Sequence, residues 1–93
     1  IGNSVPRNFS LEQNYPNPFN PVTSIKFGIP KQSNVRVIIY DALGREVKIL
    51  IDNQLGGGNY KVDWDAADSP SGIYFYRIIT SDYSETKKMI LIK

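Results

Sequence analysis

The side chains that most often carry catalysis are missing from this 93-residue sequence, which has no histidine and no cysteine. Without histidine there is no general base of the usual kind, no imidazole for zinc and no Ser-His or Cys-His pair. The groups left to consider are an acidic cluster, a set of aromatic residues and several lysines near the C-terminus. We therefore expect a protein that is not an enzyme and that holds neither a metal nor a cofactor.

Asp63, Asp65 and Asp68 form the acidic cluster, so a calcium site has to be considered. A calcium loop of the EF-hand type needs oxygen ligands at its first, third and fifth positions and a glutamate at its twelfth. Counting from Asp63, the fifth position is Ala67 and the twelfth is Tyr74, so the pattern fails. We interpret the carboxylates as solvated groups at a strand end and a turn, with an irregular surface calcium site as the open alternative.

The aromatic residues could form a platform for sugars or nucleic-acid bases. Trp64, Tyr60 and Tyr74 stand at alternate positions of short apolar runs, and we interpret them as core side chains because aromatic residues dominate core energetics. Tyr40 and Phe75 fall on the opposite faces of their runs, so they are the better candidates for contact with a ligand.

Length and net charge exclude further classes of protein. Ninety-three residues suit one domain. A net charge of +2 is too small to favour nucleic acid, which binds concentrated basic surface. The longest apolar runs, Val37–Tyr40 and Met89–Ile92, are far shorter than a membrane span. We expect a monomer that neither binds nucleic acid nor inserts into a membrane.

The elements that must position these residues are strands. Short β-rich runs recur with turn residues between them, which is typical of a sandwich or barrel, and no stretch shows a sustained helical period. The expected strands are Phe9–Gln13, Thr23–Ile29, Val35–Asp41, Arg45–Asp52, Asn59–Asp65, Gly72–Thr80 and Glu85–Ile92. This pattern predicts an all-β fold, an immunoglobulin-like antiparallel β-sandwich of about seven strands.

Residues 41–44 read Asp-Ala-Leu-Gly and predict a tight turn in which Gly44 takes a positive φ. In the strand that follows, we expect Val47 to point inward together with either Ile49 or Leu50. That ambiguity predicts a β-bulge.

Residues 15–21 read Tyr-Pro-Asn-Pro-Phe-Asn-Pro, and this proline-asparagine heptad cannot be a central strand. Each proline fixes its own φ and pushes the preceding residue toward extended geometry. The side chains of Asn17 and Asn20 can close small turns. We interpret the heptad as a stiff connector between the first two strands or as a recognition surface.

Lys87, Lys88 and Lys93 gather near the C-terminus. Lysines on an edge strand commonly prevent edge-to-edge pairing, which needs no partner. The functional alternative is a partner that inspects the C-terminal end, and an accessible edge on the last strand would let it dock by strand addition.

Four blocks of this sequence, in this order, resemble a known family. The blocks are Tyr15–Pro21, Tyr40–Val47, Ser71–Arg77 and Lys87–Lys93. Together they resemble the type A C-terminal sorting domain of the type IX secretion system, found in Bacteroidetes and their relatives. The resemblance covers residues 9–93. The domain that follows filament-capping segments in flagellar hook assembly proteins is similar in the middle blocks.

The resemblance implies a non-catalytic seven-stranded domain at residues 9–93, with residues 1–8 as a linker to a missing N-terminal cargo. It implies that the cargo passes through the periplasm, that an outer-membrane type IX translocon recognises the domain, and that a sortase removes it. The cargo would then be secreted or anchored at the cell surface. Carried over by position, the recognition residues would be Pro16, Asn17, Pro18, Gly72, Tyr74, Lys88 and Lys93.

Two other functions fit an all-β domain of this composition. An accessory carbohydrate-binding sandwich attached to a glycosidase would use exposed tyrosine and phenylalanine side chains. The other is a structural spacer or assembly domain of the hook-capping kind, which a flagellar segment in the missing N-terminal sequence would indicate.

Overall fold

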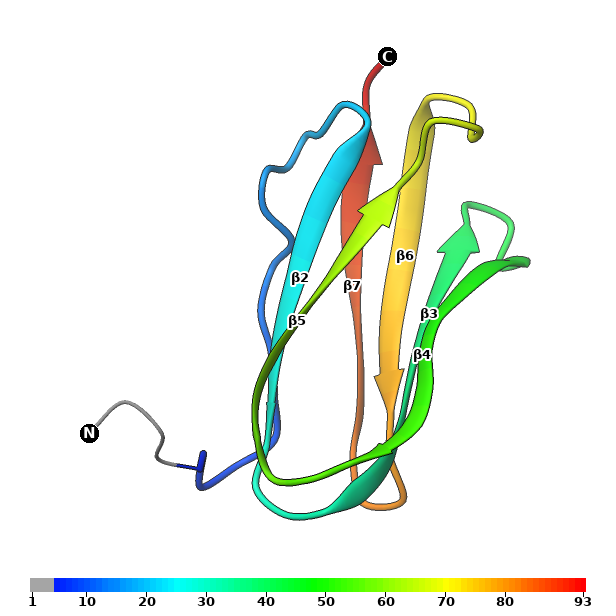
Figure 1. Ribbon diagram of the computed structural model, residues 1–93. Coiled ribbons are helices and arrows are strands. Elements are labelled where there is room, and N and C mark those ends of the chain that lie inside the picture. Colours follow the sequence, from blue (N-terminus) through cyan, green and yellow to red (C-terminus); the bar gives the residue numbers. More distant parts are fainter. Residues whose placement is uncertain (1–4) are drawn as a thin grey trace.

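Seven strands form in the computed structural model, which describes residues 5–93. The strands are β1 (Ser10–Leu11), β2 (Val22–Ile29), β3 (Ser33–Asp41), β4 (Glu46–Leu55), β5 (Gly58–Asp65), β6 (Gly72–Ile79) and β7 (Ser84–Leu91). One antiparallel sheet has the order β1-β2-β5 and the other has the order β4-β3-β6-β7. The two sheets form the two layers in Figure 1. The expected all-β, immunoglobulin-like sandwich is confirmed.

The core lies between the sheets because each strand alternates inward and outward side chains. Trp64 and Tyr74 are almost fully buried, with ring centroids 5.2 Å apart in an edge-to-face arrangement. Tyr60 is partly buried and stacks on Phe27 at 5.5 Å. The assignment of Trp64, Tyr60 and Tyr74 to the core is therefore confirmed. Tyr40 and Phe75 lie opposite each other on the outer face of the second sheet, where both are half-buried.

The turn between β3 and β4 has the expected form. Gly44 takes φ +83°, and its backbone N–H donates to the carbonyl of Asp41 at 2.9 Å. The carboxylate of Asp41 accepts from the backbone N–H groups of Leu43 and Arg45 at 3.0 and 2.9 Å. These bonds hold the turn rigid.

The expected bulge is present, and a second one accompanies it. The register between β3 and β4 shifts twice, which leaves Leu50 and Val47 as extra residues. Leu50 packs against the core, whereas Ile49 and Val47 are 43% and 40% exposed. The prediction that Val47 packs inward into the core is wrong, because it is an inserted residue that lines a surface groove instead.

The first strand is shorter than predicted, since only Ser10–Leu11 of Phe9–Gln13 joins the sheet. Beyond it, the backbone N–H of Asn14 donates to the hydroxyl of Tyr76 instead of to a neighbouring strand. Of the expected linker, residues 1–4 lie outside the described part. Val5 and Pro6 lie against the sandwich, where an added Cβ on Gly57 or Gly28 would meet them at 3.0 Å. Among residues 5–93 we find no helix able to cross a membrane.

Candidate functional site

The proline-asparagine heptad lies along the outer edge of β7. The backbone N–H of Phe19 donates to the carbonyl of Ile90, and the N–H of Ile92 donates to the carbonyl of Phe19, both at 3.0 Å. The N–H of Ile90 donates to Oδ1 of Asn17 at 3.0 Å. The expectation of an accessible edge on the last strand is therefore wrong at residues 90–92, because the heptad already occupies these donors and acceptors.

Contacts with the rest of the sandwich anchor the heptad on both sides. The Phe19 ring is 2% exposed and lies 5.7 Å from the Trp64 ring, between centroids. Tyr15 and Ser24 exchange two backbone hydrogen bonds of 2.9 Å, and the carbonyl of Pro21 accepts from Ala66 N–H at 2.8 Å. All three Xaa-Pro bonds of the segment are cis. Figure 1 shows it, in blue, beside β2 and β7.

A buried polar network supports the first half of the heptad. The Tyr76 hydroxyl donates to the carbonyl of Glu12 at 2.7 Å and accepts from Asn14 N–H at 2.8 Å. Burial raises the pKa of Tyr76 to about 12. The Asn14 side chain donates to Thr23 Oγ1 at 2.9 Å, and both side chains donate to the carbonyl of Pro16. Sequence reasoning missed this network, since Asn14 and Tyr76 lie 62 positions apart.

The C-terminal residue fastens the loop of residues 66–71, which precedes β6. Lys93 Nζ donates to the carbonyls of Ala67 and Ser69 at 2.5 and 2.7 Å, and its backbone N–H donates to Ser71 Oγ at 3.0 Å. The Lys93 ammonium group is therefore engaged inside the domain. Its bonds tie the end of the chain to the loop.

Gly72 and Tyr74 complete this end of the sandwich. The hydroxyl of Tyr74 donates to the carbonyl of Pro70 at 2.6 Å, while its ring is buried in the core. Gly72 takes φ +152° beside Leu91, a conformation that residues with a Cβ rarely adopt. Gly72 therefore affects the surface at this end of the sandwich through its backbone conformation, and Tyr74 does so through its buried ring and its bond to Pro70.

Lys88 is separate from the other predicted recognition residues. It lies opposite Phe75 on the outer face of the four-stranded sheet, with an exposed side chain. Its carbonyl accepts from Gln13 Nε2 at 2.8 Å, so only its backbone joins the edge that the heptad covers. Of the seven predicted residues, Pro16, Asn17 and Pro18 thus lie at the β7 edge, whereas Gly72, Tyr74 and Lys93 surround the loop.

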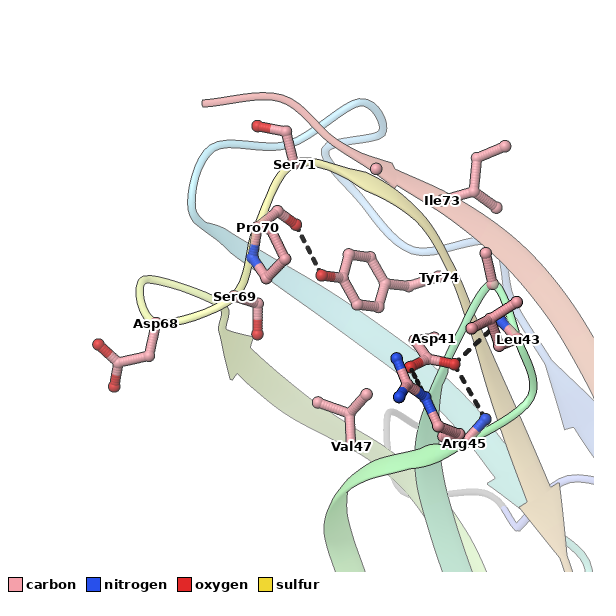
Figure 2. A pocket seen from close by; sticks show the side chains of 12 residues that line it. Asp41, Leu43, Arg45, Val47, Asp68, Ser69, Pro70, Ser71, Ile73 and Tyr74 are labelled. Atoms are coloured by element: carbon pink, nitrogen blue, oxygen red, sulfur yellow. Dashed lines mark hydrogen bonds and ion pairs between the residues drawn. The ribbon is translucent and has the colours of Figure 1, made fainter.

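An open groove of about 350 Å³ lies between the β3–β4 turn and the loop of residues 66–71. Figure 2 shows Leu43 and Val47 on one side and Pro70 and Ile73 on the other. The backbone N–H of Arg45, its nearby guanidinium group and the N–H of Leu43 keep the pKa of Asp41 below its usual value. The groove therefore has one rigid, charge-compensated wall and several apolar side chains.

A model of the family described as the secretion system C-terminal sorting domain matches residues 13–93. The chain belongs to this family. The sorting domain also resembles part of dimeric latent PorU from Porphyromonas gingivalis, with 24% identity, a TM-score of 0.69 and coverage of 90% of this chain and 9% of that chain. PorZ, described as an essential surface component of the type-IX secretion system of P. gingivalis, gives 24% identity and a TM-score of 0.59 over 91% of this chain and 11% of that chain.

These two likenesses show the fold, and the chain corresponds to about a tenth of each protein's length. A search of curated proteins returned no match. Within residues 5–93 of the sorting domain, no three acidic residues converge on a point that could hold a metal ion. Asp63 accepts from Ser24 Oγ, and Asp65 caps a turn through Ala67 N–H. Asp63 and Asp65 thus lie in the last three residues of β5, and Asp68 lies in the turn that follows.

Proposed function

We propose that this sorting domain is a non-catalytic signal that directs an attached cargo across the outer membrane through the type IX secretion system. The observation that carries the proposal is the family match over residues 13–93. The cargo precedes the domain, passes through the periplasm and is then released or anchored at the cell surface. The partners are the outer-membrane translocon and its sortase, and the domain acts as a monomer.

The geometry supports a signal that is read as a folded surface. Pro16, Asn17 and Pro18 are exposed, yet the carbonyl of Pro16 and the side chain of Asn17 accept hydrogen bonds, and the backbones of the flanking Tyr15 and Phe19 are paired with neighbouring segments. A surface that is ordered before binding avoids the entropic cost of ordering on contact. The heptad and the last strand are far apart in sequence but form one surface, so a receptor can read both at once.

The test is a fusion of residues 1–93 behind a periplasmic reporter in a host that has the type IX system. We expect the reporter at the cell surface or in the medium, because the domain supplies the signal. The control is the same reporter without the domain, which should stay in the periplasm. Equal retention of both proteins in the periplasm would refute the proposal.

Point substitutions test the recognition residues better than truncation. Removing residues 89–93 would delete Met89 and Leu91, which are 0% and 1% exposed, so export would stop through unfolding. Asn17→Ala removes one exposed hydrogen bond to Ile90, at a cost of about 1 kcal/mol. Asn20→Ala is the matched control in the same heptad. We expect Asn17→Ala to lower export at temperatures where both variants remain folded, and equal export would limit Asn17 to a structural role.

One observation favours carbohydrate binding as a second candidate. Tyr15 is 81% exposed and lines a shallow depression with Lys26 and Lys61. An exposed aromatic ring beside polar side chains is suited to stacking on a sugar. Calorimetric titration of the domain with polysaccharides should release heat that Tyr15→Ala abolishes. Absence of heat with every glycan tried would remove this candidate.

A further inference from the structure

The outer face of the β4-β3-β6-β7 sheet carries apolar side chains over the half that adjoins the β3–β4 turn. Residues opposite each other in antiparallel strands share a face, and the register places Ile38 beside Ile49, Tyr40 beside Phe75, and Ile73 beside Ile90. The exposed apolar side chains of this face, the β4 bulge and the adjoining turn include Leu43 (78%), Ile73 (44%), Ile49 (43%), Val47 (40%) and Ile90 (36%). None of them belongs to the core cluster.

The other outer face of the sandwich gives the contrast. On β2 and β5 the outward positions Ser24, Lys26, Lys61 and Asp63 are polar or charged, and Val22, at the start of β2, is the apolar exception. Folding therefore does not require an apolar outer face in this protein. A contiguous exposed apolar patch on a small domain marks an interaction site.

The apolar face ends in the groove of Figure 2. Ile73 belongs both to the face and to the lining of the groove, which Leu43 of the adjoining turn and Val47 of the β4 bulge also line. A flat apolar sheet with a hollow at one end offers a partner a place to insert one large side chain, and such buried anchors dominate binding energy.

Charge indicates the kind of partner. Arg77 on β6 and Lys88 on β7 border Phe75 on this face, and neither makes an ion pair within 4.0 Å among the described residues. The outward positions of β6 and β7 include no carboxylate, and the acidic residues of the face, Glu46 and Asp52, lie on β4. The β6–β7 half thus combines apolar side chains with two uncompensated cations.

We propose that this outer face is the docking surface for a protein of the export machinery that presents apolar side chains bordered by carboxylates. The inference rests on the proposed function and names the chemistry of its partner. Arginine suits such a contact because its guanidinium group binds a carboxylate in two places.

Two other occupants fit the face less well. A second copy whose β6–β7 half met its own counterpart would bring Arg77 and Lys88 against like charges. A two-fold contact that instead laid the β4 half, with Glu46 and Asp52, over these cations is tested by the sedimentation experiment below. An anionic lipid surface is recruited by clusters of about four to eight basic residues, whereas this half of the face has two.

The test uses the reporter fusion with the full 93-residue chain and charge reversal on either face. Arg77→Glu should lower surface export about tenfold, because a like charge now meets the carboxylates of the partner. Arg77→Lys should retain most export. Lys61→Glu, on the polar outer face, is the matched control and should match the wild type. Arg77 is not one of the predicted recognition residues, so its effect reports on the face alone.

The apolar part is tested separately with Ile73→Thr, which keeps a β-branched residue at an exposed position, and we expect it to reduce export as Arg77→Glu does. Thermal unfolding of each variant should stay close to that of the wild type, because both side chains are exposed. If the wild-type fusion stays in the periplasm, the proposed function fails. If the wild type and both variants are exported equally, only this inference fails.

Two measurements in solution test the other two occupants, a second copy of the chain and an anionic lipid surface. Sedimentation of the purified 93-residue chain should show a monomer. In pelleting experiments with anionic phospholipid vesicles, the wild type and Arg77→Glu should pellet with the vesicles to the same extent. A dimer that Arg77→Glu or Ile73→Thr dissociates would overturn the inference in favour of a second copy. Vesicle binding that Arg77→Glu abolishes would overturn it in favour of a lipid surface.

Discussion

Replacing Phe19 with alanine should detach the heptad from the last strand. The Phe19 ring is 2% exposed and packs against Trp64, so its removal leaves a cavity in the core. Truncation of a buried phenylalanine costs about 3–5 kcal/mol. A domain of this size has a free energy of unfolding of about 5–14 kcal/mol. The substitution should therefore remove a large part of the stability and lower the Tm by roughly 12–40 °C.

Denaturant unfolding gives the change in free energy, and amide hydrogen exchange locates it. The N–H of Ile90 is bonded to Asn17 Oδ1 and that of Ile92 to the carbonyl of Phe19. In Phe19→Ala both amides should exchange faster than the loss of global stability explains. The amide of Ile25, in the buried middle of β2, should follow global stability alone.

Tyr15→Ala is the matched control for this experiment. The Tyr15 ring is 81% exposed, and its two hydrogen bonds to Ser24 involve only the backbone. We expect its effect on the free energy of unfolding to stay within about 0.5 kcal/mol. A cost below about 1 kcal/mol for Phe19→Ala, or full protection of Ile92 in that variant, would refute the view that this ring fastens the heptad to β7.

Further predictions concern the polar network and the loop. Tyr76→Phe strands the N–H of Asn14 and a carbonyl, so the free energy of unfolding should fall by about 2–4 kcal/mol, and a loss below about 1 kcal/mol would contradict the network. Burial raises the pKa of Tyr76 from 10.0 to about 12, so the phenol ionises at lower pH in the unfolded chain than in the folded one. The contribution of the neutral Tyr76 to the free energy of unfolding should therefore be complete below pH 10 and be lost toward pH 12. A free energy of unfolding that stays constant across that range would disprove this linkage. Gly72→Ala should cost about 1–3 kcal/mol through its positive φ, whereas Gly56→Ala, also with open space around it, should not. Lys93→Met should speed amide exchange in the loop of residues 66–71 and spare β2, and unchanged exchange in the loop would show that Lys93 does not fasten it.

Local signals in the sequence were reliable where the structure depends on neighbouring residues. The turn at Gly44 follows from the conformational freedom of glycine and the capping capacity of Asp41, which act over four residues. The ambiguity between Ile49 and Leu50 predicts the bulge, but it does not predict which of the β4 side chains face the core. A second inserted residue at Val47 reverses the alternation again, and the apolar pattern alone does not reveal it.

The candidate site depends on contacts between distant segments. Sequence blocks identified the heptad and the C-terminal lysines as related elements, but gave no reason for the relation. The structure shows that Asn17 bonds to Ile90, which lies 73 positions away, and that Lys93 bonds to the loop before Gly72. The last strand, whose sequence predicts an accessible edge, is covered where the heptad pairs with it.

The sequence by itself determined the all-β fold class, the approximate positions of the strands and the family. These depend on composition, on the two-residue alternation of apolar side chains and on the order of short motifs. The tertiary structure decided which groups remain available to a partner. Edge pairing conceals the backbone of Ile90 and Ile92, and core packing conceals Tyr74. Two-layer packing covers only the inner face of each sheet, so the apolar outer face with Arg77 stays open. Whether a group is exposed to a partner depends on contacts between segments far apart in the chain, so a local sequence pattern cannot reveal it.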